Sequence, residues 1–150
     1  MTEDRADLIR HYREMRSALL AAIDGPSDEV LSQPTLDGWS VKDHLAHVAL
    51  WDEIRVAEVL RISAGFDSAW KTNGEGDDVY NELGHRLRSG LSLDQVRWEL
   101  ADTHARLLSA IQQASERGLD GSLYGEAGLR SNHEAVHTGW LRRWRAERKS

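Results

Sequence analysis

Two histidines near the C-terminus, His133 and His137, are spaced so that they can bind one metal ion together. Residues four positions apart on a helix project from the same face. On a helical wheel this face also carries apolar residues, namely Leu129, Val136, Trp140 and Trp144. Both imidazoles are therefore expected to point toward the core, where unpaired polar nitrogens are costly. A divalent metal would satisfy both nitrogens, and the His-x3-His spacing has the reach to bind it.

A pair of histidines supplies only two ligands, and the best candidate for a third is His47, far upstream. Three neutral imidazoles leave a coordination position for water or substrate. The alternative is that His133 and His137 are core or surface residues that happen to fall four apart. Among the other histidines, we interpret His44 as a boundary residue rather than a hydrogen-bonding partner of a ligand, and His104 as a hydrogen-bonded core residue.

The same segment, residues 133–137, matches the short H-E-x-x-H motif of metalloproteases, in which the glutamate acts as general base. The longer form of that motif fails here. Gly139 comes one position early, and Arg143 stands where a third histidine belongs. A protease is therefore disfavoured.

Apolar periodicity and capping residues predict four long helices. The first covers residues 3–23, where apolar residues recur at spacings of three and four. The second begins at a capping box formed by Ser40 and Asp43 and extends to about residue 62. The third begins at a similar box at Ser92 and extends to about residue 116. The last begins near Ser131, which can form a cap together with Glu134.

The segments between these helices are less regular. Residues 27–33 are expected to form one or two helical turns, 34–38 a loop, 73–78 a turn-rich loop and 79–88 a short helix. No stretch alternates with the period of a strand. Each long helix is apolar on one side only, so the helices must pack together. The prediction is an all-α single domain over residues 1–150, a four-helix bundle with a long elaborated connection between helices two and three.

Composition narrows the classes of partner. The net charge of −6, from 19 Lys and Arg against 25 Asp and Glu, argues against a surface for nucleic acid or anionic membranes. The absence of cysteine means that a metal must be held by nitrogen and oxygen atoms. The N-terminus is charged, and no stretch approaches ~18 apolar residues. We therefore expect a soluble cytoplasmic protein.

One stretch carries a family resemblance. Residues Trp39 to His47 read W-S-V-K-D-H-L-A-H, close to the pattern W-S-x-x-[DE]-x-L-x-H. With the late His-x3-His spacing and residues 78–81, the chain resembles the DinB/YfiT-like superfamily of metal-dependent four-helix bundles over nearly its whole length. The resemblance implies an up-and-down bundle in an unusual connection order, in many members a homodimer. It also implies that zinc or nickel is bound by three residues, His47, His133 and His137.

Two positions depart from the family pattern. Many members have a glutamate directly before the last histidine, where this sequence has Val136, and its glutamate is Glu134 instead. Position 44 is usually apolar and is His44 here. The first departure puts in doubt any role carried over for a family glutamate, and the second alters the surroundings of the ligands.

The resemblance does not determine the reaction, because the superfamily includes thiol-dependent S-transferases, isomerases and proteins that inactivate reactive natural products. The first hypothesis is a metal-dependent enzyme, a hydrolase or thiol-dependent transferase, acting on a small molecule, with a low-molecular-weight thiol as cosubstrate in the second case. Glu134 is the candidate base, although an ideal helix turns it about 100° from His133. Three tryptophans either line an apolar pocket above the metal or pack in the core: Trp51, Trp140 and Trp144.

Two alternatives remain open. The protein can be a non-catalytic bundle that binds or sequesters a small molecule, with a structural metal or none. It can also be a metal-free bundle in which buried histidines bond to carboxylates. An exchangeable coordination site distinguishes the enzyme from the binder.

Overall fold

The computed structural model describes residues 2–34, 38–71 and 74–149. In these residues the chain forms six α-helices, two short 3-10 helices and no strand, which confirms the all-α prediction. The α-helices are α1 (Arg5–Ala22), α2 (Asp28–Leu31), α3 (Val41–Ser63), α4 (Gly74–Arg88), α5 (Leu93–Gln113) and α6 (His133–Lys149). The 3-10 helices are η1 (Arg117–Leu119) and η2 (Gly121–Leu123).

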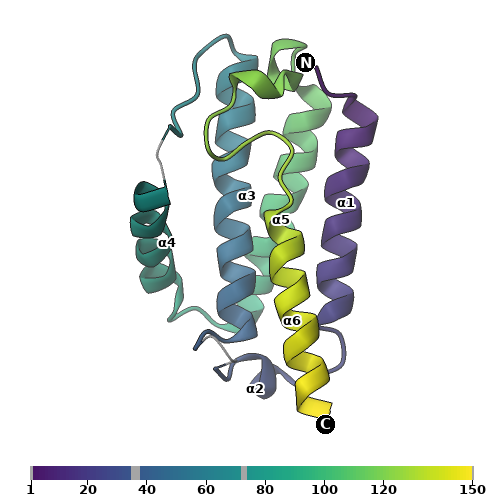
Figure 1. Ribbon diagram of the computed structural model, residues 1–150, viewed down its shortest axis with the longest axis vertical. Helices are drawn as coiled ribbons and strands as arrows, with labels where there is room; N and C mark the ends of the chain where they lie inside the picture. The colour runs from purple at the N-terminus through teal and green to yellow at the C-terminus, as the bar shows by residue number, and fades with distance from the viewer. Residues whose placement is uncertain (1, 35–37, 72–73, 150) are drawn as a thin grey trace.

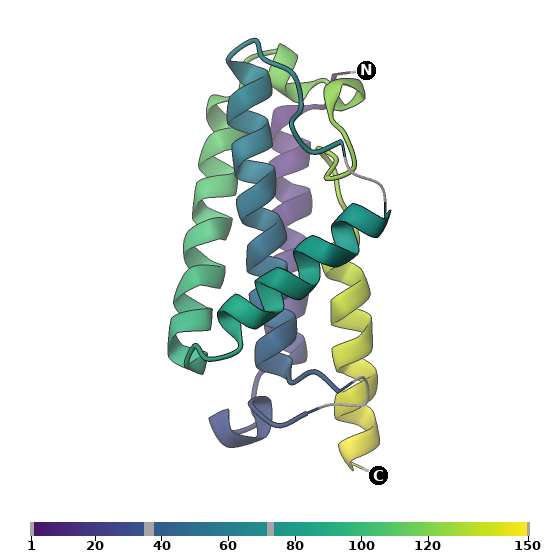
Figure 2. The ribbon, with the colours of Figure 1, turned by 90° about the vertical axis from the view of Figure 1, so that its left-hand side faces the viewer.

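The four long helices α1, α3, α5 and α6 lie side by side along the long axis of the molecule (Figure 1). Their closest packing is between α3 and α5 and between α1 and α6. The shorter helix α4 crosses the outer side of α3 obliquely (Figure 2). Helix α3 is thus covered from several directions, and its buried residues include His44, Leu45, Ala46, His47 and Val48 in an unbroken run. No helix among the described residues is both long and apolar enough to cross a membrane.

The predicted starts of helices α3 and α5 are confirmed at their capping residues. The Ser40 hydroxyl accepts the backbone N–H of Asp43 at 3.1 Å, and the Asp43 carboxylate accepts the backbone N–H of Ser40 at 2.9 Å. Ser92 accepts the N–H of Gln95 in the same way. These bonds satisfy backbone donors that the first helical turn leaves unpaired. The start of α3, and with it the position of His47 along the bundle, is therefore set locally.

The apolar faces of the long helices meet in two large clusters. One joins the end of α1 to the beginnings of α3 and α5 and the second half of α6, with Leu45, Val96, Leu100 and Leu141 almost fully buried. The other lies toward the opposite end, around Leu8, Val59, Leu107 and Ile111. Burial of a leucine or valine side chain contributes about 1.5–3 kcal/mol. The histidines and the buried charged residues lie between helices held by these clusters.

The connection between α3 and α5 differs from the prediction. The turn-rich loop expected at residues 73–78 is wrong for Gly74–Asp78, which form the first turns of α4; Asn73 lies outside the described residues. Tertiary contacts explain the extension, because the Trp70 indole donates to Asp77 at 3.1 Å and the Trp51 indole donates to Asn81 at 2.7 Å. Such contacts override the low helix propensity of Gly74 and Gly76. In the loop expected at 34–38, residues 35–37 also lie outside the described residues.

Candidate metal centre

Three imidazoles converge between α3 and α6. One ring nitrogen each of His47, His133 and His137 can be chosen so that all three lie within 4.8 Å of one another. Nε2 of His133 is 3.4 Å from Nε2 of His47 and 3.1 Å from Nε2 of His137. Two nitrogens bound to zinc at about 2.0–2.1 Å with tetrahedral angles are about 3.3 Å apart. The spacing of the rings therefore fits a divalent metal, and the all-nitrogen donor set suits zinc or nickel.

Helix geometry brings these rings together. His133 and His137 lie one turn apart at the beginning of α6 and share one of its faces. His47 lies in the second turn of α3, on the side that α6 covers. The ring centroids of His47 and His133 are 5.0 Å apart, and those of His47 and His137 are 4.9 Å apart.

Burial keeps these imidazoles neutral. It lowers the pKa of His47 to about 3, with smaller contributions from His133 and His44. It lowers the pKa of His137 to about 2, and it also lowers the pKa of His133, where the positive charge of Arg55 adds to the effect. Neutral imidazole is the form that binds a metal, so these three rings would need no deprotonation to bind one near neutral pH.

His44 is not a boundary residue, and that interpretation was wrong. Its side chain is 2 % exposed, and its Nδ1 lies 2.8 Å from Nδ1 of His137. Because His44 precedes His47 by three residues, the two rings share a face of α3, and α6 covers both. A metal-binding histidine usually donates its second ring N–H to a fixed acceptor, which orients the ring. If Nε2 of His137 held a metal, Nδ1 of His44 would be in position to be that acceptor. His104, in contrast, is half-buried on α5 and not a core residue.

The three tryptophans that were expected either to line one pocket or to pack in the core lie in three different environments. Trp51 is 8 % exposed, and its ring lies 6.3 Å from that of His133. Trp140 is 47 % exposed and touches His137 edge-on at 4.9 Å, whereas Trp144 packs in the core cluster at the far end of α6. Val136, expected on the buried face, is 48 % exposed. The wide apolar pocket of three tryptophans is therefore not formed.

Sequence reasoning assigned no role to a fourth tryptophan, Trp39, nor to His85. The Trp39 ring lies edge-on at 5.5 Å from both His44 and His47. Its other side stacks on His85 at 4.8 Å with nearly parallel planes. Trp39 thus covers the imidazoles from the side of α4. The only sequence signal for it was its place in the family pattern.

A cavity of about 220 Å³ opens beside His133. It is bounded by α3, α4, the loop before α6 and α6 itself, through residues Trp51, Arg55, Asp77, Asn81, Glu126, Ala127, Ser131 and His133. Most of these side chains are polar. The cavity next to the histidine cluster is therefore a polar pocket with one tryptophan wall.

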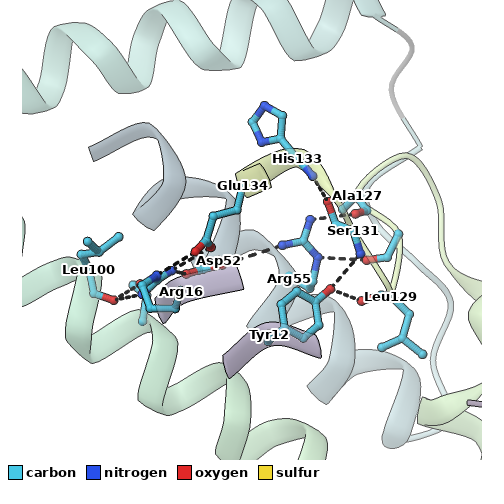
Figure 3. A network of polar contacts seen from close by, with 12 residues as sticks. Tyr12, Arg16, Asp52, Arg55, Leu100, Ala127, Leu129, Ser131, His133 and Glu134 are labelled. Atoms are coloured by element: carbon cyan, nitrogen blue, oxygen red, sulfur yellow. Dashed lines mark hydrogen bonds and ion pairs between the residues drawn. The ribbon is translucent and has the colours of Figure 1, made fainter. Parts of the chain in front are cut away.

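A network of buried charges lies near His133 (Figure 3). Arg16 of α1 donates through Nε and Nη2 to the two oxygens of Glu134, at 3.0 and 3.1 Å. The same Nη2 donates to Asp52 of α3 at 2.5 Å, and Nη1 donates to the Leu100 carbonyl at 2.8 Å. Figure 3 shows the Glu134 carboxylate turned toward Arg16 and away from the His133 ring. Glu134 therefore does not cap α6; the Ser131 hydroxyl accepts the His133 N–H instead.

The network continues into the loop before α6. Arg55 donates through Nε to the Gly128 carbonyl at 3.1 Å and through Nη2 to the Ala127 carbonyl at 2.9 Å. The Tyr12 hydroxyl donates to the Leu129 carbonyl and accepts the backbone N–H of Ser131. The loop that leads into His133 of α6 is thus held by α1 and α3. The sequence signal that could have indicated this buried network is the pair of charged residues Asp52 and Arg55, three positions apart in an otherwise apolar helix.

Comparison with known proteins identifies the family of the chain. The family model of the DinB superfamily matches residues 11–141. The chain belongs to the DinB superfamily. The resemblance stated from the sequence is therefore confirmed.

Two solved structures share the fold of this DinB chain. An uncharacterised protein from Escherichia coli UTI89 has a TM-score of 0.76 and 16% identity, over 97% of this chain and 94% of that one. The mycothiol-dependent maleylpyruvate isomerase has a TM-score of 0.64 and 17% identity, over 93% of this chain and 58% of that one. Among curated proteins, none matches the chain. At these identities the likeness concerns the fold.

Proposed function

We propose that this DinB protein is a metal-dependent enzyme that acts on a small molecule, as a hydrolase or a thiol-dependent transferase. The observation that carries the proposal is the convergence of His47, His133 and His137, with Nε2 atoms 3.4 and 3.1 Å apart, beside a polar cavity. These three residues are the proposed ligands of a divalent ion, zinc or nickel. Three protein ligands are typical of catalytic zinc sites, whereas structural sites have four.

A divalent ion in this site would act as a Lewis acid. Residues of the chain would orient the ligands, shield them and form the walls of the substrate site. His44 holds the ring of His137 in one orientation, and Trp39 shields the imidazoles from the side of α4. Trp51 supplies one wall for the substrate, and Arg55 fixes the loop that forms another.

The role of Glu134 as a base stays a prediction. Its two carboxylate oxygens bind Arg16, and its side chain is 6 % exposed. A general base must reach the proton that it removes, directly or through one water. The ion pair argues that Glu134 instead fixes the position of α6 relative to α1.

A thiol cosubstrate is part of the transferase form of the proposal. The similar solved isomerase is mycothiol-dependent by its name, and this chain has no cysteine of its own. We also propose that α1, α3, α5 and α6 form a four-helix bundle that acts as one domain over residues 1–150. The homodimer and the cytoplasmic location stay predictions.

Metal content tests the proposal directly. Protein purified without a histidine tag is analysed by elemental mass spectrometry, for wild type, His133→Ala and His104→Ala. We expect about one zinc or nickel per chain in wild type and in His104→Ala, because His104 lies outside the cluster, and a loss in His133→Ala. Absence of metal from all three, even after reconstitution, would contradict the proposal.

The alternative is a non-catalytic protein that binds or sequesters a small molecule in the same cavity. The polar lining beside His133 is compatible with both functions. Turnover separates them. A metal-loaded protein that binds small thiols or acids, yet converts no substrate in hydrolysis and thiol-transfer screens, would favour the binder.

A further inference from the structure

Of the two buried arginines Arg16 and Arg55, the positive charge of Arg16 is neutralised more closely by carboxylates. Arg16 donates to both oxygens of Glu134, to Asp52 and to the Leu100 carbonyl. Arg55 is 4 % exposed, and its ion pair is longer, with 3.9 Å between Nη1 and Asp52 Oδ1. Within the part of the chain that the structure describes, its hydrogen bonds go to two neutral carbonyls, those of Ala127 and Gly128.

Arg55 also lines the cavity beside His133, and its charge reaches that ring. A guanidinium has five N–H donors, and the two carbonyls take only two of them. Its ion-pair partner Asp52 also pairs with Arg16 at 2.5 Å, so one carboxylate is shared by two buried cations and Arg55 is only partly neutralised. A buried cation is stabilised by a partner that replaces the water it has lost. The cavity is where such a partner can enter.

Two neighbouring side chains of the cavity also present donors. Asn81 accepts the Trp51 indole N–H through Oδ1, so its amide group is left as the donating end. The Ser131 hydroxyl accepts the backbone N–H of His133, and its own hydrogen can be donated. The cavity wall therefore offers N–H and O–H groups from three residues, and an anion accepts from all of them.

The two carboxylates of the cavity limit the charge of the ligand. Asp77 accepts the Trp70 indole N–H, and Glu126 is exposed. Their negative charges disfavour a dianion such as a phosphate ester more than a singly charged acid. The volume of about 220 Å³ limits the ligand to a small molecule.

We propose that the cavity beside His133 binds a small monocarboxylic acid, whose carboxylate pairs with Arg55 and accepts hydrogen bonds from Ser131 and Asn81. This inference deepens the proposed function, since it names the substrate class of the same site. That the bound acid is the substrate rests on the proposed function. That the acid binds does not. Arg55, Ser131 and Asn81 are present whether or not a metal is bound.

The test is an NMR titration with three probes of equal length: propionate, 1-propanol and propylammonium. The signals followed are the indole N–H of Trp51 and the Nε–H of Arg55, in metal-free and in zinc-loaded protein. We expect saturable shifts with propionate at least tenfold tighter than with either other probe, already in the metal-free protein. Equal affinities, or tighter binding of propylammonium, would overturn the proposal.

Asn81→Asp is the decisive variant, since it keeps the oxygen that accepts the Trp51 indole and replaces the donor by a negative charge. Propionate affinity should fall about tenfold or more. Gln112→Glu adds the same charge at an exposed position of α5 and should leave the affinity unchanged. Equal propionate affinity in wild type and Asn81→Asp would overturn the assignment. A protein that takes up no metal yet prefers propionate would refute the proposed function alone.

Discussion

Nδ1 of His137 lies 2.8 Å from Nδ1 of His44, and both side chains are almost fully buried. One of these two nitrogens must carry the hydrogen. If Nε2 of His137 held a metal, its Nδ1 would carry the proton and donate to His44, which would then be protonated on Nε2. The pair therefore sets the tautomers of two histidines, one on α3 and one on α6.

This relationship predicts that His44→Phe weakens metal binding. Phenylalanine fills the space but accepts no hydrogen bond, so the ring of His137 loses its orientation. Loss of such a partner typically costs 10–100-fold in metal affinity. Competition with a chromophoric chelator measures the affinity, and His104→Phe, a change of the same type outside the cluster, serves as the control. An unchanged affinity in folded His44→Phe would contradict a role for this contact.

The buried charge network predicts a large effect on stability. Arg16→Met leaves the carboxylates of Asp52 and Glu134 buried without their main cation. Breaking a buried ion pair in this way costs about 3–5 kcal/mol in the free energy of unfolding. Urea denaturation measures it. Arg10→Met is the matched control, because its ion pair with Asp7 is exposed and is expected to contribute about 1 kcal/mol or less. Similar losses in both variants would show that the network contributes little.

Glu134→Gln separates the two roles of Glu134. The amide keeps an oxygen that accepts from Arg16, so the variant should remain folded and retain its metal. If Glu134 only positions α6, the activity on a substrate found by screening should fall by no more than a few fold, with an unchanged pH profile. A general base contributes about 10²–10⁴-fold. A loss of that size at full metal content would identify Glu134 as the base.

The local features of the sequence predicted the elements that carry the site. Ser40 and Asp43 marked the start of α3 because a capping box is made within four residues. His133 and His137 were predictable as a pair because helix geometry alone places them on one face. His47 could be named only as the best candidate for a third ligand, since a contact across 86 residues has no local signal; the family pattern then supported it.

The rest depends on packing between distant segments. Arg16, Asp52 and Glu134 come from three helices, and only their packing brings the charges together. His44 was misread for the same reason, because its burial depends on how closely α6 covers α3. The first turns of α4 were missed because their glycines indicate a turn, whereas indole hydrogen bonds from Trp51 and Trp70 hold them.

The histidine pKa values predict how stability depends on pH in metal-free protein. Burial, with help from Arg16 and Arg13, lowers the pKa of His104 to about 4. A histidine with a lowered pKa takes up its proton first in the unfolded state. Stability therefore falls as pH drops from about 6.5 toward 4. The same sign holds for His47 and His137, which have pKa values of about 3 and about 2.

His104→Gln should make this decline less steep. The ring is half-buried, so solvent screens it, and its share is less than the roughly 1.4 kcal/mol per pH unit of a fully shifted group. Urea denaturation at pH 7 and pH 5, with chelator present, gives the two free energies of unfolding. His11→Gln is the control. A decline as steep as that of wild type would contradict the assignment for His104.

Gly125 lies next to the residues that line the cavity, and its close contact with Trp70 predicts that a larger side chain at this position lowers stability and weakens binding. A Cβ built at this position would lie 2.0 Å from the Trp70 carbonyl oxygen, which already accepts the backbone N–H of Glu126. A backbone atom cannot move aside as the end of a flexible side chain can. Gly125→Ala must therefore push apart the loop that contains Gly125 and the loop that contains Trp70. Such overpacking costs about 1–3 kcal/mol in the free energy of unfolding.

The displacement should also weaken propionate binding, since Glu126 and Ala127 line the cavity. Gly90→Ala is the control, because its Cβ would meet open space. If Gly125→Ala matches Gly90→Ala in stability and propionate affinity, the close contact between these loops does not shape the cavity.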